Sequence, residues 1–525
     1  MSARLPALLP WAPLPALLLA ILAGPGLELH LPWLLLGTRF ELDATGRLFL
    51  LFSTILWTLA GYQARHQLAG DAHEGRFAGF FLATLAGNLL LILAADLAGF
   101  YLGYALMTFA AYGLIVHKGS AETLRAGRVY LVMALLGEAL LLAAFLQLAQ
   151  LAGSLQLAEA RAALAMAPGR EVIIGLLLVG FGIKAGALLL HLWLPLAHPA
   201  APVPASAVLS GVLIKAGLLG WLRFLPLGMT ASDWGWVLAV AGLAAIFYGV
   251  AVGLAQQQPK VILAYSSISQ MGFMTLGVGL GLLVPAAWPL LLPAVTLYAL
   301  HHALTKGALF LGLGLAGRRS VLIGQGLLAL SLAGAPLSGG ALAKQALKEA
   351  LPAGAWEVWL PGLLGLGALG TSLLMARLLW RLAATAPGWA RPPRRVFLAW
   401  WLAVLLGLTG PWWLPAGAPV LAQTPAGLWA AAWPVLVGGL LAWVAARHWQ
   451  VRHPPAIPAG DLLWPLLRLG CLLRRRLPRP PVLRLAPPRW LPGLPLGETR
   501  LGGNRAQGVL LLLGLTLLLG LLALA

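Results

Sequence analysis

The sequence predicts an all-α, polytopic transmembrane helical bundle, and three observations lead to this fold class. Of 525 residues, 60% are apolar and only 10% are charged, whereas ordinary soluble domains carry roughly 25% charged residues. Apolar runs of about 18 or more residues, long enough to cross a bilayer as helices, recur along most of the chain. The basic residues lie between these runs, so the net charge of +20 indicates membrane orientation rather than nucleic-acid binding.

About fifteen membrane spans are predicted, since roughly 20 residues cross the hydrocarbon core. The first span follows Arg4, and the alternative for it is a secretory signal whose apolar core precedes Ala23. Nothing downstream resembles a secreted domain, which favours a span. The predicted spans are 5–23, 44–62, 77–96, 97–116, 128–152, 171–190, 205–226, 235–255, 260–283, 287–315, 321–350, 356–382, 396–421, 427–447 and 506–525.

Basic residues alternate between the connections and so predict the orientation of the chain. Connections after odd-numbered spans contain few of them, chiefly Arg39, Arg161 and Arg170, whereas those after even-numbered spans contain many. Cytoplasmic loops carry the excess of Lys and Arg in membrane proteins. We therefore expect a multi-pass protein of a bacterial-type inner (cytoplasmic) membrane, with its N-terminus in the cytoplasm.

Residues 448–505 form the one long polar stretch and are rich in Pro and Arg. Within it, residues 461–474 are typical of an amphipathic helix on the cytoplasmic face, where its arginines would attract anionic lipid headgroups. A solvated basic linker is the alternative. The single cysteine, Cys471, excludes an internal disulfide and any iron–sulfur cluster or thiolate zinc site made within the chain.

Ionisable side chains near mid-span are the strongest functional signal. Each is costly in a bilayer and needs a partner, a hydrated cavity or a function. Lysines and a glutamate in series can exchange protons, because desolvation favours a neutral amine while a nearby carboxylate favours a charged one. The alternative, local pairing or snorkelling, is less consistent with four lysines near mid-span. The predicted proton-translocation residues are Glu138, Lys184, Lys215, His302, Lys306 and Lys344.

Three histidines are candidate relays, because imidazole titrates near neutral pH. His301 precedes Lys306 by about one helical turn, and His191 and His198 flank a predicted broken helix in the first half of the chain. His191 and His198 are spaced i,i+7 with no nearby carboxylate, which makes a poor metal site. No metal, cofactor or redox centre is therefore predicted in this chain.

Glycine and proline predict two interrupted helices. Gly180 and Gly340 each precede a lysine by four residues, and Pro195 and Pro336 lie close by. Helices weaken or break at such positions. Broken helices that recur in two halves of a membrane protein indicate repeated transport units.

Four ordered motifs carry a resemblance to a known family. Residues 182–207 read GIKAGALLLHLWLPLAHPAAPVPASA, residues 260–272 read KVILAYSSISQMG, residues 302–310 read HALTKGALF, and residues 331–344 read SLAGAPLSGGALAK. Over residues 40–380 the chain resembles the antiporter-like subunits shared by Mrp-type cation/proton antiporters, the membrane arm of respiratory complex I and membrane-bound hydrogenases.

The resemblance implies two inverted five-helix units, each with a broken helix, and a chain of charged residues along the membrane midplane. It matches Lys184 and Lys344 to the ionisable residues of the two broken helices, and Lys215 to the bridging lysine. It matches His302 and Lys306 to the histidine and lysine of the second unit. The implied organisation is N-terminal spans at 1–76, a first repeat at 77–226, a second repeat at 235–382, C-terminal spans at 383–447, the basic segment at 448–505 and a final span at 506–525.

Three departures from the family pattern are visible. Residues 104–107 read Tyr-Ala-Leu-Met, where the family usually carries a glutamate that partners the first lysine. We therefore expect Glu138, one helix later, to partner Lys184. One span rather than two precedes Asp43, which agrees with a cytoplasmic N-terminus, and the connection at 317–320 is shorter than usual.

The predicted function is that of an ion-translocating subunit of an Mrp-like cation/proton antiporter complex, moving protons with sodium as the candidate coupled ion. The alternative is a proton-pumping membrane subunit of a complex I-like quinone oxidoreductase or a membrane-bound hydrogenase, driven by redox chemistry in other subunits. A third alternative, raised by the missing carboxylate at Ala105, is a structural subunit. The expected partners are other membrane subunits, protons, sodium and anionic lipid, and no nucleic acid.

Overall fold

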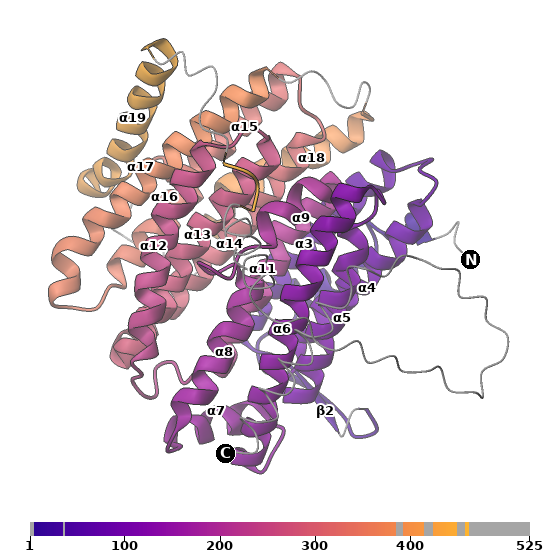
Figure 1. The fold of residues 1–525 in the computed structure, drawn as a ribbon, viewed down its shortest axis with the longest axis vertical. Coiled ribbons are helices and arrows are strands. Elements are labelled where there is room, and N and C mark those ends of the chain that lie inside the picture. The colour runs from indigo at the N-terminus through magenta and orange to yellow at the C-terminus, as the bar shows by residue number, and fades with distance from the viewer. Residues whose placement is uncertain (1–4, 35–36, 385–391, 414–423, 449–456, 461–525) are drawn as a thin grey trace, which may run out of the picture. The chain divides into compact units, whose positions relative to one another are not determined.

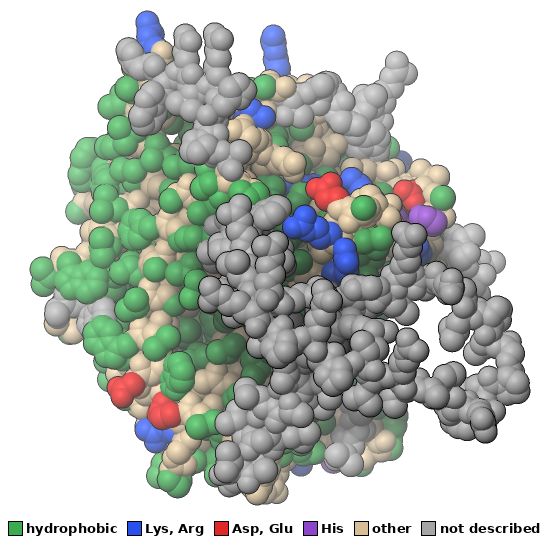
Figure 2. Space-filling view, in the orientation of Figure 1, with side chains coloured by type: hydrophobic (Ala, Val, Ile, Leu, Met, Phe, Trp, Pro, Cys, Tyr) green, Lys and Arg blue, Asp and Glu red, His purple; other side chains and the backbone are tan. Residues whose placement is uncertain are grey.

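A computed structural model describes residues 5–34, 37–384, 392–413, 424–448 and 457–460 (Figure 1). This part of the chain contains 11 helices that are long and apolar enough to cross a membrane, so the all-α transmembrane class is confirmed. Apolar side chains cover much of the face shown in Figure 2, and the charged groups visible there gather in small clusters. The predicted span 506–525 and amphipathic segment 461–474 lie outside the described residues.

Helices make up nearly all of the regular structure, with one short hairpin near the N-terminus. In chain order the elements are α1 (Leu5–Leu8), α2 (Leu14–Leu22), β1 (Leu27–Leu31), β2 (Thr38–Leu42), α3 (Ala44–Gln67), α4 (Glu74–Leu93), α5 (Leu97–Ile115), α6 (Ala121–Ala152), α7 (Leu157–Met166), α8 (Arg170–Ala185), α9 (Leu194–Ala200), α10 (Val203–Val208), the π-helix η2 (Leu209–Leu213), α11 (Ile214–Phe224), α12 (Trp234–Leu254), α13 (Pro259–Leu283), the 3₁₀-helix η3 (Pro285–Ala287), α14 (Trp288–Leu313), α15 (Arg319–Ala333), α16 (Gly339–Glu349), α17 (Ala355–Ala383), α18 (Arg394–Thr409), the 3₁₀-helix η4 (Gly410–Trp413) and α19 (Pro425–His448).

The N-terminal region differs from its prediction. Residues 5–23 form two short helices, α1 and α2, so the prediction of one continuous span there is wrong. Pro10 and Pro13 lie between them, and proline both lacks a donor and disfavours helix at the residue before it. The antiparallel hairpin of β1 and β2 was also not predicted, although the alternation of leucine with polar residues over 27–31 has the period of a strand.

Both predicted helix interruptions are confirmed. Helix α8 ends before Gly186 (φ 70°), and α15 ends before Gly334 (φ 94°). Both glycines adopt the left-handed conformation that ends helices at low steric cost. Three residues further on, Leu189 (φ 69°) and Leu337 (φ 62°) share that conformation, which is uncommon for a bulky residue. The same local backbone design therefore occurs twice in the chain.

The positions of the breaks correct one detail of the prediction. Gly180 lies inside α8 and Gly340 lies inside α16, so neither glycine makes the break. The chain leaves the helix only at the positive-φ glycines, which places the first break after Lys184 and the second before Lys344. The boundaries of the two repeats stay a prediction.

The centre of the described helices is the part that carries the predicted lysines. Helix α13 and the α10–η2–α11 segment are buried along their whole apolar lengths, whereas little of α19 is buried. Helix α14 packs against α3, α10, α13, α16 and α18, so it joins elements from both halves of the chain (Figure 1). Groups on the α10–η2–α11 segment and on α13 are thus surrounded by other helices.

Candidate functional site

Lys184 lies in the last turn of α8, just before the first helix break. Its Nζ donates a hydrogen bond to the Tyr130 hydroxyl at 3.1 Å. The same ammonium group lies 5.5 Å from the centre of the Tyr104 ring and 5.2 Å from that of the Tyr130 ring. Aromatic faces and the carbonyl end of a half-helix both favour a cation, so this buried site accommodates charge without a direct ion pair.

Glu138 faces the same small cavity as Lys184. This cavity, of about 10 Å³, is also lined by Tyr104, Thr108 and Tyr130, and a volume of this order holds about one water molecule. Both carboxylate oxygens of Glu138 and the Thr108 hydroxyl are buried with no hydrogen-bond partner among the described residues. The structure therefore brings Glu138 and Lys184 to one cavity, but no ion pair within 4.0 Å joins them in the part it describes.

Lys215 follows the π-helix η2 and lies at the start of α11. Its Nζ donates to the carbonyl of Ser210, a residue of η2, at 2.8 Å. Short π-helical segments inside α-helices are frequent at functional sites. The same Nζ contacts Nδ1 of His302 on α14, so the structure brings together two predicted residues 87 positions apart.

Lys306 lies one turn after His302 on α14 and is fully buried. Its Nζ donates to the Leu263 carbonyl at 2.6 Å and to the Ser266 hydroxyl, both on α13. The His198 ring stacks on Phe310 with 4.6 Å between centroids, and Lys306 Nζ lies 5.9 Å from the centre of that Phe310 ring. His198 thus joins this central group through ring contacts.

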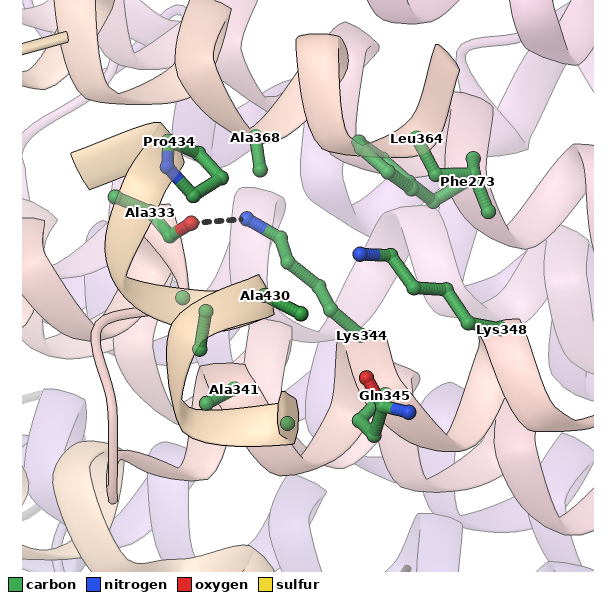
Figure 3. A pocket seen from close by; sticks show the side chains of 13 residues that line it. Phe273, Ala333, Ala341, Lys344, Gln345, Lys348, Leu364, Ala368, Ala430 and Pro434 are labelled. Carbon is green, nitrogen blue, oxygen red and sulfur yellow. Dashed lines mark hydrogen bonds between the residues drawn. The ribbon is translucent and has the colours of Figure 1, made fainter. Parts of the chain in front are cut away.

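Lys344 forms the last group, beyond the second helix break. Its Nζ donates to the carbonyls of Leu332 at 2.8 Å and Ala333 at 2.7 Å, the last residues of α15 (Figure 3). These carbonyls lack helical partners and form the negative end of the half-helix. His301 Nε2 hydrogen-bonds Ser331 Oγ at 3.0 Å, so His301 also reaches this break.

Helix α14 connects the central and terminal groups. Its neighbouring histidines turn to different elements, since His302 contacts Lys215 on α11 and His301 contacts Ser331 on α15. His191 lies in the linker between α8 and α9, with its ring 5.2 Å from that of Tyr248.

Several partners of the lysines were missed by sequence reasoning. Tyr130 carries no local signal, because it meets Lys184 only through tertiary packing of residues 54 positions apart. Ser266 stands inside the motif at 260–272 and could have been chosen as a polar residue in an apolar helix. Lys348 was overlooked because it lies close to the predicted end of a span.

The four predicted lysines share one feature. Their hydrogen bonds go to carbonyls, hydroxyls or an imidazole, which are neutral groups. Within the described ranges the ion pairs are His117–Asp71, Arg170–Glu171 and Arg223–Asp43, and none of them involves these lysines.

Comparison with known proteins gives the family. A family model described as "NADH:quinone oxidoreductase/Mrp antiporter, TM" matches residues 94–360, a range that includes both helix breaks and all four lysines. The chain belongs to this family. The antiporter-like resemblance of the four motifs is therefore confirmed.

Members of this family similar to the chain carry two kinds of name. Hydrogenase-4 component B from Escherichia coli (strain K12) is 35% identical over 257 residues, which cover 46% of this chain and 38% of that protein. The putative antiporter subunit mnhA2 from Staphylococcus haemolyticus is 28% identical over 365 residues, covering 63% and 46%. The chain thus spans less than half the length of these curated relatives.

A solved structure shares the fold. A chain from the structure of the Mrp complex from Dietzia sp. DQ12-45-1b aligns with a TM-score of 0.74 and 22% identity, covering 92% of this chain and 59% of that chain. The shared fold therefore includes most of the helices of this chain.

Proposed function

We propose that this family member is an ion-translocating subunit of a multi-subunit membrane complex, moving protons with sodium as the candidate coupled ion. An Mrp-like cation/proton antiporter is the favoured assembly, in keeping with the putative antiporter subunit and the Mrp fold neighbour. The observation that carries the proposal is the set of four buried lysines whose amines bind only neutral groups among the described residues.

The physical argument concerns the two charge states of a buried amine. A charged amine fixed in an ion pair cannot easily release its proton, whereas carbonyl and hydroxyl partners stabilise the ammonium only in part. An amine with such partners is tolerated in both states. Two charges about 10 Å apart at an effective dielectric constant of about 20 repel by roughly 1.7 kcal/mol. Protonation of one lysine therefore shifts the proton occupancy of the next by more than tenfold.

The residues of the proposed path fall into three groups. Glu138 and Lys184 share the first cavity, Lys215, His302 and Lys306 form the central group, and Lys344 with His301 forms the last. Glu138 would act on Lys184 through a water in the cavity, in place of the carboxylate missing at Ala105. Ala105 does not line that cavity, whereas its neighbour Tyr104 does, which supports Glu138 as the acidic partner.

Substitution of Lys215 tests the proposal. Lys215→Arg keeps a positive charge that cannot be released, and Lys215→Gln removes the charge. If the amine must lose and regain a proton, both variants lower proton flux at least tenfold in proteoliposomes that contain the intact complex. Lys118→Gln, at an exposed loop lysine, is the matched control and keeps full flux.

The outcome for Lys215→Arg decides between transport and structure. Flux retained in Lys215→Arg and lost in Lys215→Gln would assign Lys215 a structural charge and overturn the relay. If replacement of Lys184 and Lys344 also left flux unchanged, the structural-subunit alternative would be favoured over transport.

A redox-driven complex is the second candidate, supported by the 35% identity to hydrogenase-4 component B. In that case the chain is the proton-pumping membrane subunit of a hydrogenase-like or quinone-reducing assembly. Purifying the intact complex separates the candidates, since only the second contains iron–sulfur partner chains.

Membrane orientation completes the proposal. The alternation of basic connections favours a cytoplasmic N-terminus in a bacterial-type inner membrane. With that orientation, α16 ends on the outer side of the membrane. In a Cys471→Ser background, a cysteine placed at Gly153, in the exposed connection after α6, is expected to be labelled by a membrane-impermeant reagent added outside. Labelling only from inside would reverse the orientation.

A further inference from the structure

We infer that Lys348 is a further relay of the proposed path, between Lys344 and the aqueous phase at the end of α16, and that α19 closes the cavity shared by the two amines. This inference rests on the proposed function and adds a residue that the sequence did not indicate. It follows from the cavity beneath α19, from the positions of the two amines in it and from their unequal partners.

The two lysines lie one turn apart on the same face of α16, as residues at i and i+4 do. Both line a cavity of about 20 Å³, together with Phe273 of α13 and residues of α17 and α19. In Figure 3 the Lys344 amino group is turned to the Ala333 carbonyl, and the Lys348 amino group is turned toward the Lys344 side chain. A volume of this order holds one or two waters, which provides a route for a proton between the amines.

The two amines differ in their partners and their access. Lys344 is 8% exposed and is held by the two carbonyls at the end of α15. Lys348 is partly exposed and forms no hydrogen bond or ion pair with any described residue. Helix α16 ends one residue later, at Glu349. Lys348 is therefore the amine nearer to the aqueous phase, with a side chain free to exchange a proton there.

The lining of the cavity favours a single shared proton. Its described residues include two lysines and no carboxylate, so nothing in it neutralises two ammonium groups at once. Like charges in one poorly solvated site disfavour double protonation. A proton on Lys348 therefore makes release from Lys344 easier, and a deprotonated Lys348 can accept the proton that Lys344 releases.

Helix α19 covers this cavity with small side chains. Gly427, Ala430, Ala431 and Pro434 line its α19 wall. Helix α19 packs mainly against α17, while most of its surface stays exposed. Small residues leave the space that the amines and water occupy. A larger side chain at Ala430 would fill part of the cavity from this wall and leave both lysines in place.

The test compares Lys348 variants in proteoliposomes of the intact complex. Lys348→Met removes the amine but keeps a similar stem, and we expect proton flux to fall at least fivefold. Lys348→Arg keeps the charge but holds its proton, so it is expected to lose flux as well while assembling normally. Lys118→Met, which removes an exposed loop amine that does not line this cavity, is the matched control and keeps flux.

The possible outcomes distinguish a failure of the relay at Lys348 from a failure of the proposed function. Wild-type flux in Lys348→Met, with flux abolished in Lys344→Met, would overturn the relay at Lys348 and leave the proposed function standing. Unchanged flux in Lys344→Met would overturn the proposed function itself. Full flux in Lys348→Arg would assign a fixed charge rather than a relay.

Filling the cavity is a second test that leaves both amines in place. Ala430→Leu is expected to lower flux at least fivefold, because it displaces the water between the amines. Gly439→Leu, on the same helix at a position where an added Cβ meets no atom within 4 Å, controls for the effect of bulk on α19. Equal flux in the two variants would refute the role assigned to this cavity.

Discussion

The close packing at the second helix break makes Gly340→Ala the sharpest test of the geometry around Lys344. A methyl carbon added at Gly340 would lie 2.8 Å from the Ser331 carbonyl carbon, still closer to its oxygen, and 3.0 Å from Cε1 of His301. Carbon atoms normally approach to about 3.5 Å, so α15 and α16 must separate by roughly 0.7 Å or more. The contact with Ser331 is with backbone atoms, so no flexible side chain on α15 can absorb this shift.

The separation removes specific hydrogen bonds. Lys344 would lose its 2.7 Å and 2.8 Å bonds to the end of α15 unless its side chain follows. Overpacking and the loss of bonds to a charged group each cost about 1–3 kcal/mol, so we expect a loss of about 2–4 kcal/mol.

Thermal unfolding of the purified protein in detergent measures this loss, with Gly326→Ala as the control. Gly326 is on α15, and a methyl group added there meets no atom within 4 Å, so alanine should leave stability unchanged or raise it by about 0.5–1 kcal/mol through helix propensity. A melting temperature for Gly340→Ala equal to that of the wild type would refute the close contact between the two half-helices. An equal loss of stability in Gly340→Ala and Gly326→Ala would show that the loss is not specific to the contact at Gly340.

Three further predictions concern other parts of the chain. Tyr130→Phe removes the hydroxyl that binds the ammonium group at the end of α8 and should lower proton flux severalfold with unchanged melting temperature; unaltered flux would show that this bond is dispensable. Arg223→Met breaks the 3.2 Å ion pair with Asp43 and the hydrogen bonds to backbone carbonyls at the end of α4, so the melting temperature should fall. It should fall less in Asp43→Asn, because that variant keeps the bonds to the carbonyls. Burial lowers the pKa of His117 below its ordinary value of 6.5, and Asp71 opposes this shift only in part. As the pH falls below about 6.5, the unfolded chain therefore binds a proton at His117 before the folded chain does, and the stability of the fold decreases. His117→Gln should therefore reduce the difference in melting temperature between pH 7.5 and pH 5.5.

The long membrane helices could be predicted from the sequence, because they depend on the local composition of the chain. Hydropathy located the long helices, because a bilayer requires about 20 apolar residues per span, and most predicted spans from 44–62 onward coincide with helices of the structure. The same rule failed at 5–23, where apolar composition was right but prolines interrupt the helix. Hydropathy cannot detect such interruptions, since proline and glycine change the backbone geometry but hardly change the mean hydropathy of a segment.

The site residues were predictable as residue types but their partners were not. Lysines in apolar helices stand out in any sequence, whereas the π-helix before Lys215 depends on a shift of one hydrogen-bond position that no local pattern indicates. The contact between Lys215 and His302 likewise requires the packing of α10 and η2, which precede Lys215, against α14. Sequence reasoning therefore named the charged groups and missed the neutral ones, such as Tyr130 and Ser266, that hold them.

The two helix breaks place their lysines in the same electrostatic setting by different routes. Lys184 precedes its break and lies in the last turn of α8, whereas Lys344 follows its break and reaches back to the last carbonyls of α15. Each lysine is thus associated with the carbonyl end of a half-helix, Lys184 by its position in the chain and Lys344 by its hydrogen bonds, and that end favours a cation. Because one lysine moves with the half-helix that ends and the other with the half-helix that begins, a small rotation at Gly334 changes the distance between Lys344 and its carbonyls. The same rotation at Gly186 does not move Lys184 relative to α8, and it changes instead the position of α9 relative to Lys184. The two breaks thus share the same backbone conformation, but a movement at each break would change the surroundings of its lysine, and so its charge, in a different way.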